Sequence, residues 1–183
     1  MFTLLGNPNT LDLFSLIFEL IDLRSFSNLW YWIALAVLWS SASHWVLGVP
    51  FDMVARAAKH GGSAAQDLQD AVRIQVNRLL YISEVSGFAL TAFAFFMITT
   101  LVLLGFYYRV EFAQAVVLML IPMYVVGLIN LRAARALRTP HDIDALRKRL
   151  TRARVLIQLV GVISIFVTAL WGMYQNLTFG ALG

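Results

Sequence analysis

Four long runs of apolar residues dominate the chain, and the polar residues gather between them. Each run has about the 20 residues that an α-helix needs to cross the hydrocarbon core of a bilayer. The runs cover residues 29–48, 79–108, 111–131 and 155–174. The third run contains Pro122, where we expect a kink because the apolar pattern continues on both sides. The pattern predicts an all-α protein, a four-helix transmembrane bundle forming one integral membrane domain over residues 1–183.

The first 28 residues predict an additional helix that lies on the outer surface of the membrane. Asp12, Ser15, Glu19 and Asp22 recur at helical spacing, and most positions between them are apolar. A narrow polar stripe of this kind is typical of an amphipathic interfacial helix. The segment lacks the basic start of a cleavable signal peptide. The helix either packs against the membrane helices or docks a partner.

The polar segment of residues 49–78 also predicts helix rather than coil. A short helix is expected to end at Gly61, because two consecutive glycines follow its last polar residues. Ser63 and Gln66 then match a capping box, so we expect the second membrane helix to start near Ala64. This membrane helix therefore gains a helical extension outside the bilayer.

The second long polar segment, residues 132–154, predicts the same kind of extension for the last membrane helix. Thr139 followed by Pro140 gives a helix N-cap and a first-turn proline, which places the start of that helix near Pro140. The two polar segments hold four and eight basic residues, together 12 of the 14 in the chain. By the positive-inside rule both segments are cytoplasmic and both termini lie outside.

Composition supports the membrane assignment. Hydrophobic residues make up 60% of the chain and charged residues 13%, which is about half the share usual in soluble proteins. A soluble body of this size would have to expose a largely apolar surface. We therefore expect an integral protein of a bacterial inner membrane.

Polar residues within the predicted spans gather near the cytoplasmic ends of those spans. A carboxylate in hydrocarbon is costly, so we expect Glu84 to face the bundle or a water-filled cavity. His44, Arg132 and Arg154 are its expected ion-pair partners. The layer either fixes helix register or forms a proton, cation or substrate site. Its members are His44, Glu84, Asn130, Gln158, Ser40 and Ser43.

A dense basic segment on the stem of the last helix predicts contact with anionic lipid headgroups, with an acidic cytosolic partner as the alternative. No aromatic platform accompanies these charges, so nucleic acid is not an expected partner. The segment comprises Arg147, Lys148, Arg149, Arg152 and Arg154.

The sequence contains no recognisable catalytic motif. It has no cysteine, and its three histidines are His44, His60 and His141, with none at metal-binding spacing. A Gly-x-Ser-x-Gly nucleophile motif and glycine-rich phosphate-binding fingerprints are also absent. We therefore expect no metal and no cofactor, assign no catalytic residue, and favour a protein that is not an enzyme.

Arg73 and Asn77 open the second predicted membrane helix with three residues between them. This segment resembles the start of the Arg-x-x-x-Asn-x-x-Glu motif of the membrane-associated eicosanoid and glutathione proteins. That family builds trimers of four-helix subunits, which bind glutathione near the cytoplasmic face. The resemblance implies a thiol-transferase-like site at Arg73 and Asn77, although Leu80 stands where the motif has glutamate.

Three functional hypotheses follow. The first is an accessory, assembly or scaffold subunit of a membrane complex, for which Gly87, Gly127, Gly161 and Gly172 would permit close helix contacts. The second is a homo-oligomeric ion channel or small transporter whose cytoplasmic vestibule is the polar layer. The third is a membrane enzyme resembling the glutathione-binding family.

Overall fold

A computed structural model describes residues 26, 28–139 and 142–180, which are almost entirely helical. The predicted interfacial helix lies outside the described residues, apart from Phe26 and Asn28. The elements are α2 (Leu29–His44), β1 (Trp45–Val46), β2 (Val49–Pro50), α3 (Phe51–His60), α4 (Gly62–Val102), the π-helical turn η2 (Leu103–Tyr107), α5 (Glu111–Ala136) and α6 (Ile143–Gly180).

Three helices are long and apolar enough to cross a membrane. They are α4 continued by η2, then α5, and then α6 as far as Leu177. These helices include the predicted spans at 79–108, 111–131 and 155–174, apart from Tyr108, which follows η2. The chain therefore has the helices of a membrane protein.

The fourth predicted span, residues 29–48, is not confirmed. Helix α2 ends at His44 after 16 residues, because the chain turns back there through the antiparallel pair β1–β2. Leu47 and Gly48 form the turn with left-handed φ angles of 56° and 77°. The run of apolar side chains continues through this hairpin, so hydropathy alone does not reveal where the helix stops.

The polar segments are helical, as predicted, but their helix starts differ from the prediction. Helix α4 begins at Gly62, and no side chain caps it. The predicted capping box does not form, because Ser63 already lies in the first turn and Gly61 occupies the cap with a φ of 58°. Helix α6 begins at Ile143, while Pro140 lies outside the described residues. Helix α5 continues through Pro122.

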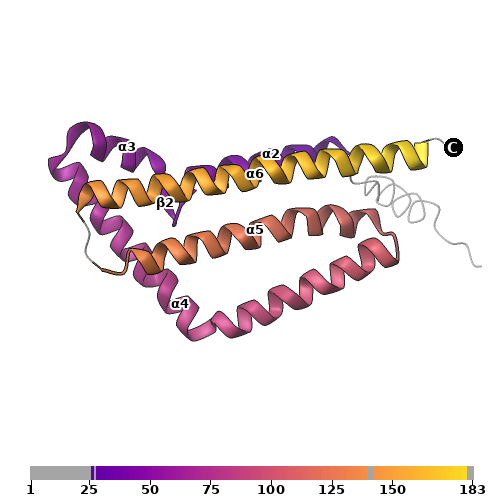
Figure 1. Cartoon of the computed structure of the whole chain (residues 1–183), viewed down its shortest axis with the longest axis horizontal. Helices are drawn as coiled ribbons and strands as arrows, with labels where there is room; N and C mark the ends of the chain where they lie inside the picture. Colours follow the sequence, from indigo (N-terminus) through magenta and orange to yellow (C-terminus); the bar gives the residue numbers. More distant parts are fainter. Residues whose placement is uncertain (1–25, 27, 140–141, 181–183) are drawn as a thin grey trace, which may run out of the picture.

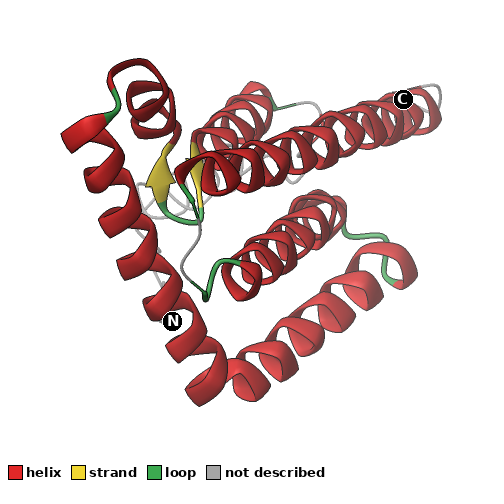
Figure 2. Ribbon diagram, turned by 60° about the vertical axis from the view of Figure 1, so that its left-hand side comes forward, coloured by secondary structure: helices red, strands yellow, loops and turns green. Residues whose placement is uncertain are grey.

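The helices do not form a parallel bundle. Figure 1 shows α2 running beside α6, and α5 lying between α6 and the second half of α4. Figures 1 and 2 both show that α4 bends sharply near its middle. Ser83, Ser86 and Gly87 lie in this middle section, and they are residue types at which helices commonly kink. The first half of α4 therefore crosses one end of the molecule instead of projecting straight from it.

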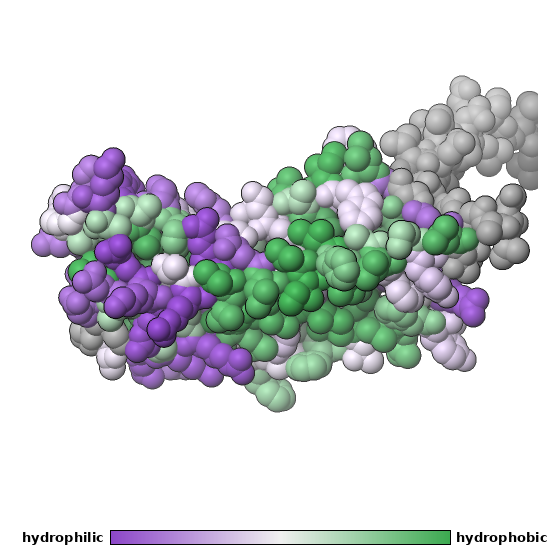
Figure 3. All heavy atoms as spheres, turned by 45° about the horizontal axis from the view of Figure 1, so that its top comes forward, coloured by the Kyte–Doolittle hydropathy of each residue, from purple (hydrophilic) through white to green (hydrophobic). Residues whose placement is uncertain are grey.

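Polar side chains gather at that end. Figure 3 shows hydrophilic residues there and mostly hydrophobic residues over the middle of the visible face. We call this region the polar end; it comprises α3, the first half of α4, the last turns of α5 and the first turns of α6. One core cluster of buried side chains extends through the polar end, and α4 contributes one residue per turn to it. The cluster includes Leu68, Val72, Val76 and Leu80 from α4, and Leu146, Leu150, Ala153 and Ile157 from α6.

Helix α2 packs closely on α6 at a glycine. A Cβ atom added to Gly161 would lie 2.8 Å from Cε3 of Trp39, closer than real Cβ atoms approach other atoms. Trp39 is only 4% exposed, and Leu35 one turn earlier is 2% exposed. The absence of a side chain at Gly161 therefore allows the indole to lie against the backbone of α6.

Candidate functional site

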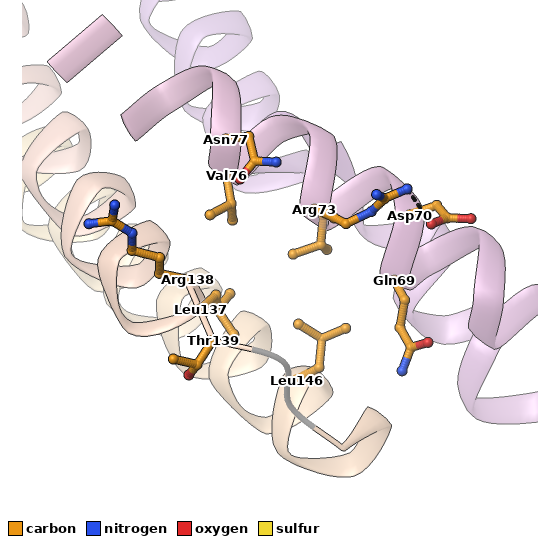
Figure 4. A pocket seen from close by; sticks show the side chains of 10 residues that line it. Gln69, Asp70, Arg73, Val76, Asn77, Leu137, Arg138, Thr139 and Leu146 are labelled. Carbon is orange, nitrogen blue, oxygen red and sulfur yellow. Dashed lines mark hydrogen bonds and ion pairs between the residues drawn. The ribbon is translucent and has the colours of Figure 1, made fainter. Parts of the chain in front are cut away.

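A cleft of about 310 Å³ opens at the polar end, between the first half of α4 and the connection from α5 to α6. Figure 4 shows the α4 side chains on one wall and residues 137–139 with Leu146 on the other. Its base is apolar and its rim is polar. The apolar residues are Val72, Val76, Leu137 and Leu146, and the polar residues are Gln69, Asp70, Arg73, Asn77, Arg138 and Thr139.

Helical periodicity explains the polar wall. Gln69, Arg73 and Asn77 are spaced four residues apart, so their side chains lie above one another along α4. They flank the buried stripe that begins at Leu68 and Val72. The two residues of the motif resemblance, Arg73 and Asn77, therefore share one wall of the cleft.

Both cationic groups of the cleft already have carboxylate partners. Nη2 of Arg73 lies 3.0 Å from Oδ1 of Asp70, and Nη1 of Arg138 lies 3.9 Å from Oε1 of Glu84. All four side chains are well exposed. Exposed pairs of this kind contribute at most about 1 kcal/mol each, because water screens them. The cleft is therefore a polar surface feature whose charges are balanced.

Glu84 is not placed as the sequence analysis expected. Its side chain is 64% exposed, and its ion-pair partner is Arg138 rather than His44, Arg132 or Arg154. The reason is that α4 packs only its earlier turns, from Leu68 to Leu80, into the core, and Glu84 follows the last of them. The sequence analysis grouped residues by their depth in the membrane. Depth alone does not predict which side of a helix the other helices cover.

The other members of the predicted polar layer also lie apart. Oδ1 of Asn130 accepts a hydrogen bond of 3.2 Å from the backbone N–H of Leu47, which fixes the β1–β2 turn to α5. The ring of His44 contacts the ring of Trp45 edge to face. Ser40 and Gln158 are exposed, and Ser43 is partly buried. Among the described residues, no hydrogen bond or ion pair joins two members of the layer.

The structure divides the basic segment of α6 into different environments. Nη1 of Arg149 donates to the carbonyl of Ala136, at 2.8 Å, and so caps the end of α5. The guanidinium of Arg154 lies 3.9 Å from the centre of the Phe51 ring, a cation–π contact with α3. Arg147 pairs with Asp144, whereas Lys148 and Arg152 remain exposed beside α3.

A buried amide network at the opposite end of the molecule was missed by the sequence analysis. Nε2 of Gln114 donates to the carbonyl of Gly105 at 2.7 Å, and its Oε1 accepts from Nε1 of Trp171 and from Nε2 of Gln175. The network joins η2, α5 and α6. A sequence signal existed: both glutamines lie close to the ends of apolar helices that were expected to meet on one side of the membrane.

Gly105 is essential to this junction. A Cβ atom there would lie 2.9 Å from the backbone nitrogen of Gln114, which cannot move aside as a flexible side chain can. The π-helical turn frees the Gly105 carbonyl to receive the Gln114 amide. The network is thus a structural joint in which both the amide nitrogen and the amide oxygen of Gln114 have partners.

Within the described ranges, no group of three His, Asp or Glu residues is arranged to hold a metal ion. The cleft between α4 and the α5–α6 connection contains guanidinium, amide, carboxylate and hydroxyl groups, which can bind a polar ligand by hydrogen bonds. Comparison of the chain with known proteins found no matching family model, no matching curated protein and no matching solved structure.

Proposed function

We propose that the protein is a non-enzymatic subunit of a membrane assembly and that it docks through the second half of α4. In the most apolar 18-residue stretch of α4 and η2 no residue is buried, whereas 28% of residues are buried in the corresponding stretches of α5 and α6. This difference is the observation that carries the proposal. A membrane helix that the described part of its own chain leaves uncovered is available to a helix of another subunit.

The uncovered side of α4 has a defined composition. Tyr81, Val85, Phe88 and Phe96 follow one another at helical spacing and share one side of the helix, which we call the outer face of α4. All four are exposed, and Phe88 is 91% exposed. Large aromatic residues are enriched at the centres of protein interfaces. An uncharged aromatic face suits a second membrane helix, from a partner or from another copy of this chain.

The proposal includes an orientation. With 12 of the 14 basic residues in residues 49–78 and 132–154, the positive-inside rule directs the polar end to the cytoplasm and both termini to the outside. We place the protein in a bacterial inner membrane and treat α2 as a fourth helix inserted beside α6. Its 16 residues extend about 24 Å, which is about four-fifths of a hydrocarbon core of roughly 30 Å.

The test is photo-crosslinking in the native membrane. A photoreactive amino acid replaces Phe88 on the outer face of α4, and a matched control replaces Val162, a residue of α6 that is 66% exposed. We expect a protein adduct from position 88 and only lipid adducts from position 162. Native mass spectrometry after purification in mild detergent then gives the stoichiometry of the complex.

The outcomes separate the forms of the proposal. A stoichiometric foreign protein crosslinked at position 88 identifies an accessory or assembly subunit, and a second copy identifies a self-associating scaffold. Lipid adducts alone at both positions, together with a monomeric mass, would show that lipid covers the outer face of α4 and that the proposal is wrong.

A further inference from the structure

A second groove at the polar end lies between α3 and α6 and has a volume of about 470 Å³. Its two walls differ in chemistry. Helix α3 contributes only apolar side chains, and α6 contributes mainly charged ones. The α3 residues are Phe51, Val54, Ala55 and Ala58, and the α6 residues are Asp144, Arg147, Lys148, Thr151 and Arg152.

The charge of the groove is strongly asymmetric. Arg147 is balanced by Asp144, whose Oδ1 lies 3.3 Å from its Nη1. Lys148 and Arg152 make no hydrogen bond or ion pair with any described residue, and both are exposed. They lie one helical turn apart with Thr151 beside them. Two unpaired cations and a hydroxyl group at this spacing provide donors for a phosphate group.

The position of these cations along α6 points to the source of the phosphate. The apolar run of α6 begins at Val155, three residues after Arg152 and seven after Lys148. At 1.5 Å per residue the two side chains start about 5 and 10 Å outside the apolar run. The polar region of a bilayer adds about 5–7 Å to each side of the core, so Arg152 starts at the depth of the lipid headgroups and the long side chain of Lys148 starts just outside them.

We infer that the α3–α6 groove is a binding site for the headgroup of an anionic phospholipid. Lys148, Thr151 and Arg152 bind the phosphate, and the apolar wall of α3 covers the glycerol and the first carbons of the lipid. A free phosphate ion would leave that apolar wall unused. Charge complementarity excludes a cationic ligand, because the groove carries three cations and one carboxylate.

The other clefts at the polar end lack this combination. In the cleft between α4 and α5–α6 both arginines have carboxylate partners. In the smaller cleft between α3 and α4, Arg56 pairs with Asp52 and Asp67 adds a negative charge. Only the α3–α6 groove, among the clefts described here, combines unpaired cations with a continuous apolar wall.

The inference is tested on the purified full-length protein by native mass spectrometry, titrating short-chain phosphatidylglycerol as the probe. Short-chain phosphatidylcholine and inorganic phosphate are titrated in parallel. We expect phosphatidylglycerol to bind at least tenfold more tightly than either. Equal binding of inorganic phosphate would overturn the assignment to a lipid, and equal binding of phosphatidylcholine would overturn the requirement for net negative charge.

Two variants locate the site. Lys148→Gln with Arg152→Gln removes both unpaired cations, and Arg132→Gln with Arg135→Gln removes the same charge from an exposed part of α5 that lies outside the groove. We expect the first pair to weaken phosphatidylglycerol binding at least tenfold and the control pair less than threefold. Equal losses would mean diffuse surface attraction instead of a site.

A third variant tests the apolar wall without changing any charge. Ala55→Trp fills the groove from α3, where Ala55 is exposed and its replacement leaves the buried face of α3 untouched. Loss of phosphatidylglycerol binding with normal elution on size exclusion is the expected result. Unchanged binding by this variant would show that the α3 wall takes no part, and would overturn the groove as the site.

Discussion

The two halves of α4 belong to one continuous helix and differ in a way that reverses the usual rule for burial. The first half is rich in charged and amide residues, yet it buries Leu68, Val72, Val76 and Leu80 in regular succession. The second half is almost purely apolar and buries none of its most apolar stretch. In a chain with membrane-spanning helices, high hydropathy of a segment indicates that it is surrounded by lipid. A periodic stripe of apolar residues indicates the side of a helix that packs against the rest of the chain.

The two halves of α4 are also held in place by different contacts. The first half contributes its buried stripe to the core cluster of the polar end, and α4 contacts both α3 and α5. The second half lies beside α5. The turn η2 that follows it is joined to α5 by the hydrogen bond from the Gln114 amide to the carbonyl of Gly105. Pairs of substitutions test this difference between the two halves of α4. Each pair compares the loss of stability at two positions whose contacts differ.

The largest effect is expected at the buried stripe. Leu68→Ala should lower the free energy of unfolding by about 3 kcal/mol, because Leu68 is fully buried and its removal leaves a cavity. Leu90→Ala in the second half, where Leu90 is 53% exposed, should cost less than about 1 kcal/mol. Titration of both variants with a denaturing detergent measures the losses. Comparable losses of unfolding free energy at the two positions would contradict the difference in burial between the two halves of α4.

An intermediate effect is expected at the far end of the helix. Gly105→Ala should lower stability by about 1–3 kcal/mol, because the new methyl group meets the backbone of α5. Gly87→Ala is the control: its nearest neighbour would be Oγ of Ser83 at an ordinary 3.7 Å, and alanine favours helix. The control should be neutral or stabilising by up to about 1 kcal/mol in the same titration. If Gly105→Ala left the free energy of unfolding unchanged, the close contact of Gly105 with α5 would not contribute to stability.

The smallest effect is expected where the two halves meet. Glu84→Gln and Arg138→Gln should each change stability by less than about 1 kcal/mol, since both side chains are exposed and their pair is long at 3.9 Å. A double-mutant cycle gives the coupling energy, which should fall as salt concentration rises. A coupling of several kcal/mol that resists salt would show that Glu84 and Arg138 are shielded from water, and would contradict their exposure.

Much of the helix layout could be predicted because its signals are local. Gly61 follows the last residue of α3, and Glu111 begins α5, as the sequence suggested. The end of α2 could not be predicted from hydropathy, because Trp45, Val46 and Leu47 continue the apolar run into a hairpin. The turn depends on left-handed backbone angles at Leu47 and Gly48, and leucine gives no sign of such an angle.

The candidate sites were less predictable, because they depend on which side of each helix is covered. Glu84 and Asn130 were placed at similar depth, yet one pairs with Arg138 at the surface and the other receives the N–H of Leu47. That difference depends on contacts between residues that lie far apart in the sequence, which no local pattern reveals. Likewise, the sequence does not distinguish the five neighbouring basic residues on α6. In the structure Arg154 contacts α3 and Arg149 donates a hydrogen bond to the end of α5.

The contact of Trp39 with Gly161 also has a consequence for biosynthesis. Helix α2 finds its principal partner in α6, the last helix of the described chain, 122 positions along the sequence from tryptophan to glycine. During translation, α3, α4 and α5 must all leave the ribosome before Trp39 meets the backbone notch that receives it. Packing of α2 therefore waits until α6 has been synthesised, and in a nascent chain stopped after α5 the indole of Trp39 would lack the surface that covers it.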